Sequence, residues 1–354
     1  MFSTVFLHSV PGVGRSPVSA RDLWRLPPSL WRRGWYASGS RQRRLQRPVI
    51  SVGNISVGGR GKTPVVQEIA RRLIAAGERP SILSRGYARR SVEDGVVVVS
   101  DGCRILADVA RSGDEPLLLA RALNGAAVLV ADERHLAGVL AERLFDRTVH
   151  VLDDGFQHMQ LARDVDLVIV NARDLEDRPL PFGRLREPVE ALRAATAIVI
   201  DEDGGAFPAG ARARLDRAIG TQTPVFTLRR TCGAWQPLEA DRPWPASPVP
   251  VLAVAAIAAP ERFRRTLESS GWPIADMLTF RDHHWFSPRD LDCIAAHAVG
   301  AGAAAVVTTS KDAMRLLVHR PLPLPFAHVP ITAAIEPSGA FDEWLAARLL
   351  EARA

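Results

Sequence analysis

Short apolar runs alternate with helical patterns from residue 48 onward. The run Val49–Val52 is typical of a buried strand, and a helical face of apolar residues follows it and ends at Gly77. Further strand-like runs lie at Ser81–Leu83, Val96–Val99, Ala127–Val130, Val149–Leu152, Leu167–Val170 and Ile198–Ile200. Helical patterns separate several of them, as at 114–123 and 133–144. The alternation predicts an α/β fold with a mostly parallel sheet and helices on both faces.

The pattern changes near residue 225. Prolines 237, 243, 245 and 248 interrupt the periodicity there, and a second βα pattern then begins at Val251–Ala255. It continues with helical patterns at 260–270 and 287–299 and a strand at Ala304–Thr308. We therefore predict a basic N-terminal segment (1–47), a first α/β domain (48–224), a connector (225–249) and a smaller C-terminal α/β domain (250–354).

The composition limits the class of protein. The chain has 354 residues, of which 47% are hydrophobic and 24% charged, which is ordinary for a globular protein of two domains. Its three cysteines form no CxxC pair, so neither a disulfide framework nor a zinc site is expected. No apolar run reaches the length of about 18 residues that a membrane span needs.

Positive charge is concentrated at the N-terminus. Residues 1–47 hold nine arginines and one acid, together with Trp24, Trp31, Trp35 and Tyr36. Arginine mixed with tryptophan suits a helix at a membrane surface, with the cations on anionic lipid. A nucleic-acid patch, a basic arm and a first helix packed on the domain are the alternatives.

Only two of the 45 basic residues are lysines, Lys62 and Lys311. Lys62 lies in Gly58-Gly59-Arg60-Gly61-Lys62-Thr63, between a strand pattern and a helical one, where a phosphate-binding loop belongs. A full Walker A motif would have glycine at Ser56, and partition-type ATPases would have lysine at Val57. The glycines let backbone N–H groups converge on phosphate, Lys62 can reach the β- and γ-phosphates, and Thr63 can bind Mg2+. The alternative is a glycine-rich turn without a ligand.

Two acids follow another strand, at Asp153 and Asp154. A carboxylate at a strand end is where a phosphotransferase holds Mg2+. The sequence continues with Gly155-Phe156-Gln157-His158, which is unusual for a simple Walker B motif. An Asp pair that caps a helix is the alternative.

Taken together, these strings resemble one family, the tetraacyldisaccharide 4'-kinases of lipid A synthesis, from about residue 22 to 335. The resemblance rests on the following strings: Val52-Gly53-Asn54, GGRGKTP at 58–64, Ser84-Arg85-Gly86-Tyr87, Gly113-Asp114-Glu115-Pro116, DDGFQH at 153–158, Leu185-Arg186-Glu187-Pro188, Asp282-His283 and Thr309-Ser310-Lys311-Asp312-Ala313. It implies a P-loop NTPase-like fold with a smaller second α/β domain joined by a β-ribbon. It also implies transfer of the ATP γ-phosphate to a lipid disaccharide 1-phosphate, at the cytoplasmic face of the bacterial inner membrane.

The resemblance also implies roles for single residues. Residues 56–63 would hold the nucleotide, with Tyr87, Gln157 and His158 lining the site. Thr63, Asp153, Asp154 and Glu187 would surround Mg2+. Asp114 would be the catalytic base with His283 as its partner, while Lys62, Arg134 and Arg186 would act on the transferring phosphate. No nucleic acid and no obligate protein partner are expected.

The chemistry of these residue types agrees. A sugar hydroxyl needs a carboxylate to accept its proton, and a histidine can orient that carboxylate. Asp114 could instead only cap a helix, and His283 could lie on the surface. A soluble kinase or ligase acting on a small metabolite, a nucleotide-dependent switch and a membrane-surface scaffold remain alternative functions.

Overall fold

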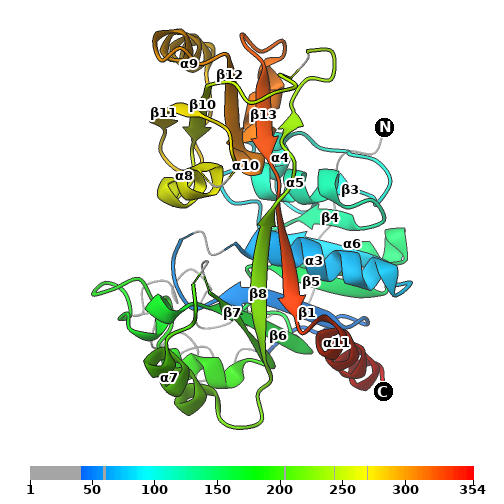
Figure 1. Cartoon of the computed structure of the whole chain (residues 1–354). Coiled ribbons are helices and arrows are strands. Elements are labelled where there is room, and N and C mark those ends of the chain that lie inside the picture. The colour runs from blue at the N-terminus through cyan, green and yellow to red at the C-terminus, as the bar shows by residue number, and fades with distance from the viewer. Residues whose placement is uncertain (1–40, 59–60, 203–204, 243, 269) are drawn as a thin grey trace.

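The computed structural model describes residues 41–58, 61–202, 205–242, 244–268 and 270–354. Within these residues the chain forms a nine-stranded sheet and a five-stranded sheet, each covered by helices (Figure 1).

In spatial order, the strands of the large sheet are β14 (Ile331–Glu336), β8 (Val225–Cys232), β7 (Ala197–Asp201), β6 (Val165–Val170), β1 (Val49–Asn54), β5 (Val149–Asp153), β2 (Pro80–Ser84), β4 (Ala127–Val130) and β3 (Val97–Ser100). Those of the small sheet are β11 (Ile274–Thr279), β10 (Val251–Ala255), β12 (Ala305–Thr309), β13 (Phe326–Val329) and β9 (Gln236–Pro237). The α-helices are α3 (Lys62–Ala75), α4 (Val109–Ser112), α5 (Asp114–Ala122), α6 (Arg134–Phe145), α7 (Ala209–Ile219), α8 (Pro260–Glu268), α9 (Pro288–Gly300), α10 (Ser310–Leu316) and α11 (Ser338–Arg353). Short 3-10 helices lie at η2 (Ala172–Leu175), η3 (Val189–Ala194) and η4 (Leu317–His319).

The large sheet is parallel apart from its two edges. Strand β1 is buried along its whole length and lies between β5 and β6, both parallel to it. Edge strands β3 and β14 run antiparallel to their neighbours. Because adjacent parallel strands end at the same edge of the sheet, the loops after β1, β5, β2 and β4 gather there. The predicted mostly parallel α/β fold is confirmed.

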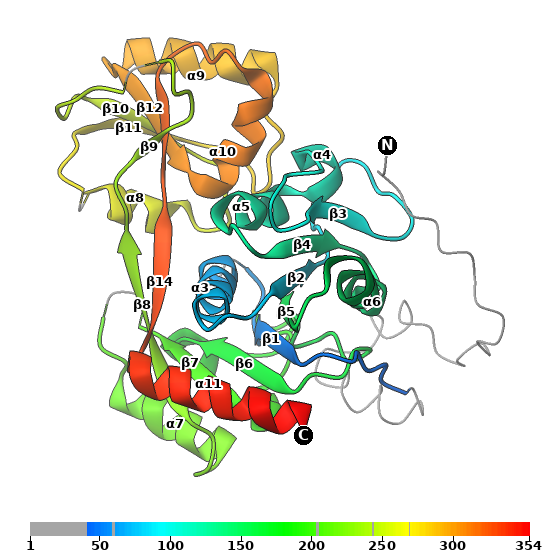
Figure 2. The same ribbon diagram turned by 90° about the vertical axis from the view of Figure 1, so that its right-hand side faces the viewer.

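Strands β8 and β14 form a two-stranded ribbon between the sheets. Residues 227–232 pair with 331–336, and Figure 2 shows the two strands running side by side from the large sheet toward the small one. Strand β8 occupies the first eight residues of the predicted connector, 225–249. After the ribbon, α11 returns to the large sheet, where Phe341 packs edge-on against Phe226 at 5.0 Å. The predicted domain boundaries stay a prediction.

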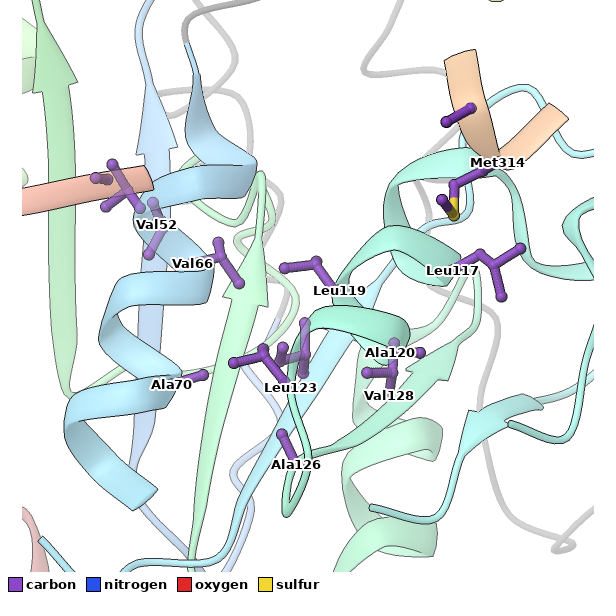
Figure 3. Packing of buried hydrophobic residues seen from close by; sticks show 14 of the residues in the cluster. Val52, Val66, Ala70, Leu117, Leu119, Ala120, Leu123, Ala126, Val128 and Met314 are labelled. Carbon is purple, nitrogen blue, oxygen red and sulfur yellow. The ribbon is translucent and has the colours of Figure 1, made fainter. Parts of the chain in front are cut away.

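The five-stranded sheet and the helices around it are called the small unit. One hydrophobic core cluster joins the large sheet to this small unit. It contains Leu117 of α5 and Met314 of α10, which lie close together in Figure 3. The small unit therefore packs on α5, and the first residue of that helix, Asp114, lies at the contact.

The N-terminal membrane segment predicted from the sequence lies largely outside the described residues. Its last part is described: Leu45 is buried against Gly138, and Arg43 pairs with Glu133. Among the helices of the described ranges, none is long and apolar enough to cross a membrane.

Candidate active site

The chain passes from β1 to α3 through the loop predicted to bind phosphate. Its backbone is left-handed at Gly58 (φ 100°) and Gly61 (φ 66°), where a side chain would be strained. Asn54 Nδ2 donates to the carbonyl oxygen of Ser56 at 2.9 Å and so shapes the first turn. Gly61 gives α3 no side-chain cap, and no acid occupies its first turn. The first N–H groups of α3 therefore form a helix end that suits an anion.

Gly59 and Arg60, both predicted to contact nucleotide, lie outside the described residues. Before them, the N–H of Val57 donates to the carbonyl of Arg184 at 2.8 Å, which ties the loop to the chain before Arg186. After them, Thr63 is the second residue of α3 and is half-buried.

Lys62, the first residue of α3, reaches back over the strand ends. Its Nζ is 3.3 Å from Oδ1 of Asp154 and 3.2 Å from Oδ1 of Asn54. The side chain is 13% exposed, so its charge is only weakly screened by water. A compact ammonium in this position can exchange an amide or carboxylate oxygen for a phosphate oxygen.

Asp153 and Asp154 have opposite electrostatic environments. Asp153 ends β5 and is 4% exposed; burial, together with the charges of Glu115 and Asp154, raises its pKa to about 7. Burial would also raise the pKa of Asp154, but Lys62 and Arg186 outweigh it and hold that pKa well below its usual range. Arg186 Nη1 donates to Asp154 Oδ2 at 2.9 Å. One carboxylate is thus firmly ionised, while its neighbour titrates near neutrality.

Gln157 connects three of the loops at this edge. Its Nε2 donates to the carbonyl of Asn54 and to Oε1 of Glu187, each at 2.9 Å. Its Oε1 accepts from Arg186 Nη1 at 3.4 Å. Glu187 is 2% exposed, so its carboxylate is held inside the site.

Arg134 and His158 meet on the other side of β5. Arg134 Nη1 lies 3.3 Å from Nδ1 of His158, and because arginine only donates, that nitrogen is the acceptor. Burial lowers the pKa of His158 to about 2, helped by the charges of Arg134, Arg163 and Arg85. The imidazole is therefore neutral across the physiological range.

Asp114 lies in a second cluster, at the contact between α5 and α10. It is 1% exposed, and its Oδ2 accepts from Arg315 Nη2 at 2.5 Å. His283 Nδ1 is 3.3 Å from the same oxygen, and the rings of His283 and Tyr87 meet edge-on at 5.0 Å. Asp114 and His283, predicted as partners, are therefore brought together from the two sheets.

Lys311 completes this cluster. Its Nζ is 3.0 Å from Nε2 of His283, 3.3 Å from Oε1 of Glu115 and 3.6 Å from Oδ1 of Asp282. Burial lowers its pKa, but Glu115, Asp114 and Asp282 outweigh burial and raise it, so the side chain stays charged. The lysine that the sequence left without a role thus lies among the acids of this cluster.

Three neighbouring side chains stabilise the charge of Asp114 against the effect of burial. Burial would raise its pKa, but the hydrogen bond to His283 and the charges of Lys311 and Arg315 lower it below the ordinary value. Both ring nitrogens of His283 face a cationic donor, because Lys311 Nζ lies 3.0 Å from Nε2 and Arg315 Nη2 lies 2.7 Å from Nδ1, which is also 3.3 Å from Asp114 Oδ2.

Sequence reasoning missed two groups in these clusters. Glu115 lies between them, because its charge raises the pKa of Asp153 and also pairs with Lys311. Arg315 is four residues beyond Lys311 on α10, so a helical projection of that string could have found it.

The oxygen ligands predicted for Mg2+ fit a hard cation that keeps water and phosphate in its shell. Across the residues the structure describes, no group of three or more His, Cys, Asp or Glu could hold a metal ion by itself. Mg2+ commonly binds one or two carboxylates together with substrate phosphates. Thr63, Asp153, Asp154 and Glu187 supply oxygens of that kind.

Known proteins resemble this chain in sequence and in fold. The family model described as Tetraacyldisaccharide-1-P 4'-kinase matches residues 24–350. A tetraacyldisaccharide 4'-kinase of Geobacter sulfurreducens is 37% identical over 314 residues, covering 85% of this chain and 87% of that protein. One from Anaeromyxobacter sp. (strain Fw109-5) is 40% identical over 296 residues, covering 79% and 76%. The crystal structure of Aquifex aeolicus LpxK in complex with ATP superposes with a TM-score of 0.71 at 28% identity, covering 91% of this chain and 95% of that one. The chain belongs to the tetraacyldisaccharide-1-P 4'-kinase family.

Proposed function

We propose that this chain is an ATP-dependent kinase that transfers the γ-phosphate to the 4'-hydroxyl of tetraacyldisaccharide 1-phosphate, a late step of lipid A biosynthesis. The observation that carries the proposal is Lys62 at the uncapped start of α3, 3.3 Å from Asp154. Membership of the family supports the acceptor, and the relative whose structure is described with ATP supports the nucleotide.

The loop 56–63 binds the nucleotide phosphates in this proposal. The N–H groups at the start of α3 and the ammonium of Lys62 offset their charge. Thr63, Asp153, Asp154 and Glu187 would hold Mg2+, which supplies further charge compensation when bound. Gln157 fixes Glu187, while Arg134 and Arg186 offset the charge that develops on the transferring group.

Asp114 accepts the proton of the 4'-hydroxyl in this proposal. His283 Nδ1 lies 3.3 Å from the carboxylate and positions it, and Lys311 contacts the opposite ring nitrogen. The supporting observation is that His283, Lys311 and Arg315 outweigh burial and keep the pKa of Asp114 below its ordinary value, which favours the ionised form that a base needs.

We also propose that the two sheets are two domains and that the N-terminal segment attaches the enzyme to the cytoplasmic face of the inner membrane. The charge and tryptophans of residues 1–47 support membrane contact. No nucleic acid and no obligate protein partner take part.

The test is an assay of the purified protein in detergent micelles with ATP, Mg2+ and tetraacyldisaccharide 1-phosphate. The expected product is the bis-phosphorylated disaccharide. Lys62→Ala and the isosteric Asp114→Asn should each lower kcat by about a hundredfold or more. Arg71→Ala, on the exposed side of the same helix α3, is the matched control and should keep wild-type turnover.

Two outcomes would reject the proposal. One is no product while the Geobacter relative, assayed in parallel, is active. The other is equal turnover with a water-soluble amino sugar that has no acyl chains, which would favour a kinase of small metabolites.

A further inference from the structure

The loop between η2 and η3 carries the most exposed large apolar side chain of the described residues. Phe182 is 85% exposed, and beside it Pro181 is exposed and Leu180 half-buried. A single exposed apolar side chain is common on soluble proteins, so exposure alone implies no function. Phe182 is distinguished by the rigidity, the charge and the position of the loop that carries it.

The loop is a closed turn that holds its tip away from the protein. The N–H of Phe182 donates to the carbonyl of Pro179 at 3.0 Å, and the N–H of Leu185 donates to the carbonyl of Arg178 at 3.0 Å. A Cβ at Gly183 would overlap the carbonyl of Arg178, so the turn is tightly packed. Because the backbone is already fixed, the phenyl ring can contact a partner with little loss of conformational entropy.

The tip of the loop is basic. Arg178 and Arg184 are both exposed, and no acid lies between them in the sequence. The nearest preceding acids are engaged: Glu176 pairs with Arg214 at 3.2 Å, and Asp177 Oδ1 accepts from the N–H of Arg178 at 2.7 Å. An apolar ring between exposed arginines suits a surface that is apolar inside and anionic outside.

The loop is fastened to the phosphate-binding loop. Arg184 contacts Val57 twice: its carbonyl accepts from the N–H of Val57 at 2.8 Å, and its Nη2 donates to the carbonyl of Val57 at 3.3 Å. Two residues later, the N–H of Arg186 donates to the carbonyl of Ile55 at 2.6 Å. A surface that holds Phe182 would therefore hold the nucleotide site at a fixed distance from itself.

The predicted membrane segment joins the described chain at the same edge of the large sheet. Arg43 pairs with Glu133, which directly precedes α6 and follows β4. Gln42 Nε2 donates to the carbonyl of Met159, beyond the end of β5, at 3.0 Å. In the order of the strands, β1 and its phosphate-binding loop lie between these contacts and β6, the strand before Phe182. The N-terminal segment and Phe182 thus lie on opposite sides of the phosphate-binding loop.

We propose that Phe182, with Arg178 and Arg184, is a second membrane contact, whose ring enters the interfacial region of an anionic bilayer. This inference rests on the proposed function, whose acylated acceptor lies in a bilayer, and adds a contact separate from the N-terminal segment. The arginines bind lipid phosphates while the ring is buried at the level of the headgroups. Two contacts on either side of the phosphate-binding loop orient that edge of the sheet toward the bilayer.

The first experiment measures binding of the full chain to phosphatidylglycerol and phosphatidylcholine vesicles by sedimentation, with no acceptor and no ATP present. Phe182→Ser should lower the partition coefficient about tenfold, as expected for the loss of a partly buried phenyl ring. Arg178→Gln should lower it about fivefold for phosphatidylglycerol and leave phosphatidylcholine unchanged. Leu144→Ser is the matched control: Leu144 is 57% exposed near the end of α6, at the opposite edge of the sheet, and its loss should have no effect.

The second experiment asks whether the side chain itself enters the lipid. Phe182→Trp and Leu144→Trp each add one indole at an exposed position. Brominated phosphatidylglycerol should quench the added fluorescence of Phe182→Trp and leave that of Leu144→Trp unchanged, each measured against wild type. Equal quenching of the two, no quenching of either, or wild-type sedimentation of Phe182→Ser overturns the inference.

The same variants separate this contact from its alternatives. If wild type forms no product but the lipid results hold, the proposed function fails and the membrane contact stands. If Phe182→Ser binds vesicles like wild type but has a raised KM for the acylated acceptor in micelles, the ring contacts the acceptor, and the bilayer contact is rejected. If Phe182→Ser instead converts a dimer to a monomer in sedimentation velocity without lipid, a second copy of the chain covers the ring, which also rejects it.

Discussion

Arg315 Nη2 lies 2.5 Å from Oδ2 of Asp114, and each side chain is 1% exposed. The two residues are 201 positions apart in the sequence. One begins α5 on the large sheet and the other lies on α10 of the small unit. The pair therefore links the two parts of the molecule at the carboxylate proposed as the base.

Arg315→Met should shift the pH dependence of the reaction. Arg315 helps lower the pKa of Asp114, so the ionised carboxylate contributes stability above its ordinary pKa of 3.8, and that contribution is lost as pH falls through the folded-state pKa. Without Arg315 that pKa rises, and the acid limb of kcat/KM should move to higher pH. The KM for ATP should not change.

Loss of this pair should also lower the free energy of unfolding by about 3 kcal/mol, because Asp114 stays buried with fewer partners. Arg315→Lys should restore part of both effects. Arg289→Met, an exposed arginine of α9, serves as the control. An acid limb that stays in place in Arg315→Met would contradict an electrostatic role for Arg315.

Asp153→Asn should change how the stability of the metal-free protein depends on pH. Burial and two neighbouring acids raise the pKa of Asp153 to about 7, so its contribution is full below its ordinary value of 3.8 and is lost as pH rises through about 7. Thermal unfolding without metal should therefore show wild type losing stability relative to Asp153→Asn between about pH 4 and 7. Mg2+ with nucleotide should restore wild type alone. If the difference in Tm between wild type and Asp153→Asn is the same at both ends of this pH range, the raised pKa of Asp153 is refuted.

Gly53→Ala should disturb the site through packing. A Cβ at Gly53 would lie 2.5 Å from Cβ of Phe156 and 2.9 Å from its backbone nitrogen. Phe156 is fully buried, so the loop that carries Asp153 and Asp154 has to move. We expect a loss of about 1–3 kcal/mol in denaturant unfolding and a fall in kcat.

Gly210→Ala is the matched control for that substitution. Gly210 lies in α7 and has nothing within 4 Å of an added Cβ, so alanine should stabilise the helix by about 0.5–1 kcal/mol. If Gly53→Ala were as well tolerated, the close approach of β1 to Phe156 would not be needed for the site.

Removal of residues 1–40 should weaken binding to anionic vesicles and leave the fold intact. The deletion ends before Arg43 and Leu45, which contact Glu133 and Gly138, so Tm should not change. Sedimentation with phosphatidylglycerol vesicles measures the effect, with phosphatidylcholine vesicles as the control for charge. Unchanged sedimentation with anionic vesicles would reject this segment as the anchor.

The sequence by itself determined the local units. Strand, loop and helix follow one another within a few residues. Periodicity and glycine spacing therefore predicted the strand at Val49–Val52, the phosphate-binding loop that carries Lys62, and the strand that ends in Asp153 and Asp154. The observed strand β1 ends two residues later than predicted, and β10 at Val251–Ala255 agrees with its prediction. Because parallel strands end at one edge of a sheet, even the clustering of these loops follows from the order of the elements.

Only the tertiary structure decided which distant side chains meet. Arg315 faces Asp114 because α10 packs on α5, a contact made by the hydrophobic core and not by any local pattern. The tertiary structure also decided the pairing of β8 with β14. The two strands are about a hundred residues apart, and each alone is only a weak indication of a strand in the sequence. Burial, which brings the pKa of Asp153 close to neutrality, likewise depends on long-range packing that a single sequence does not encode locally.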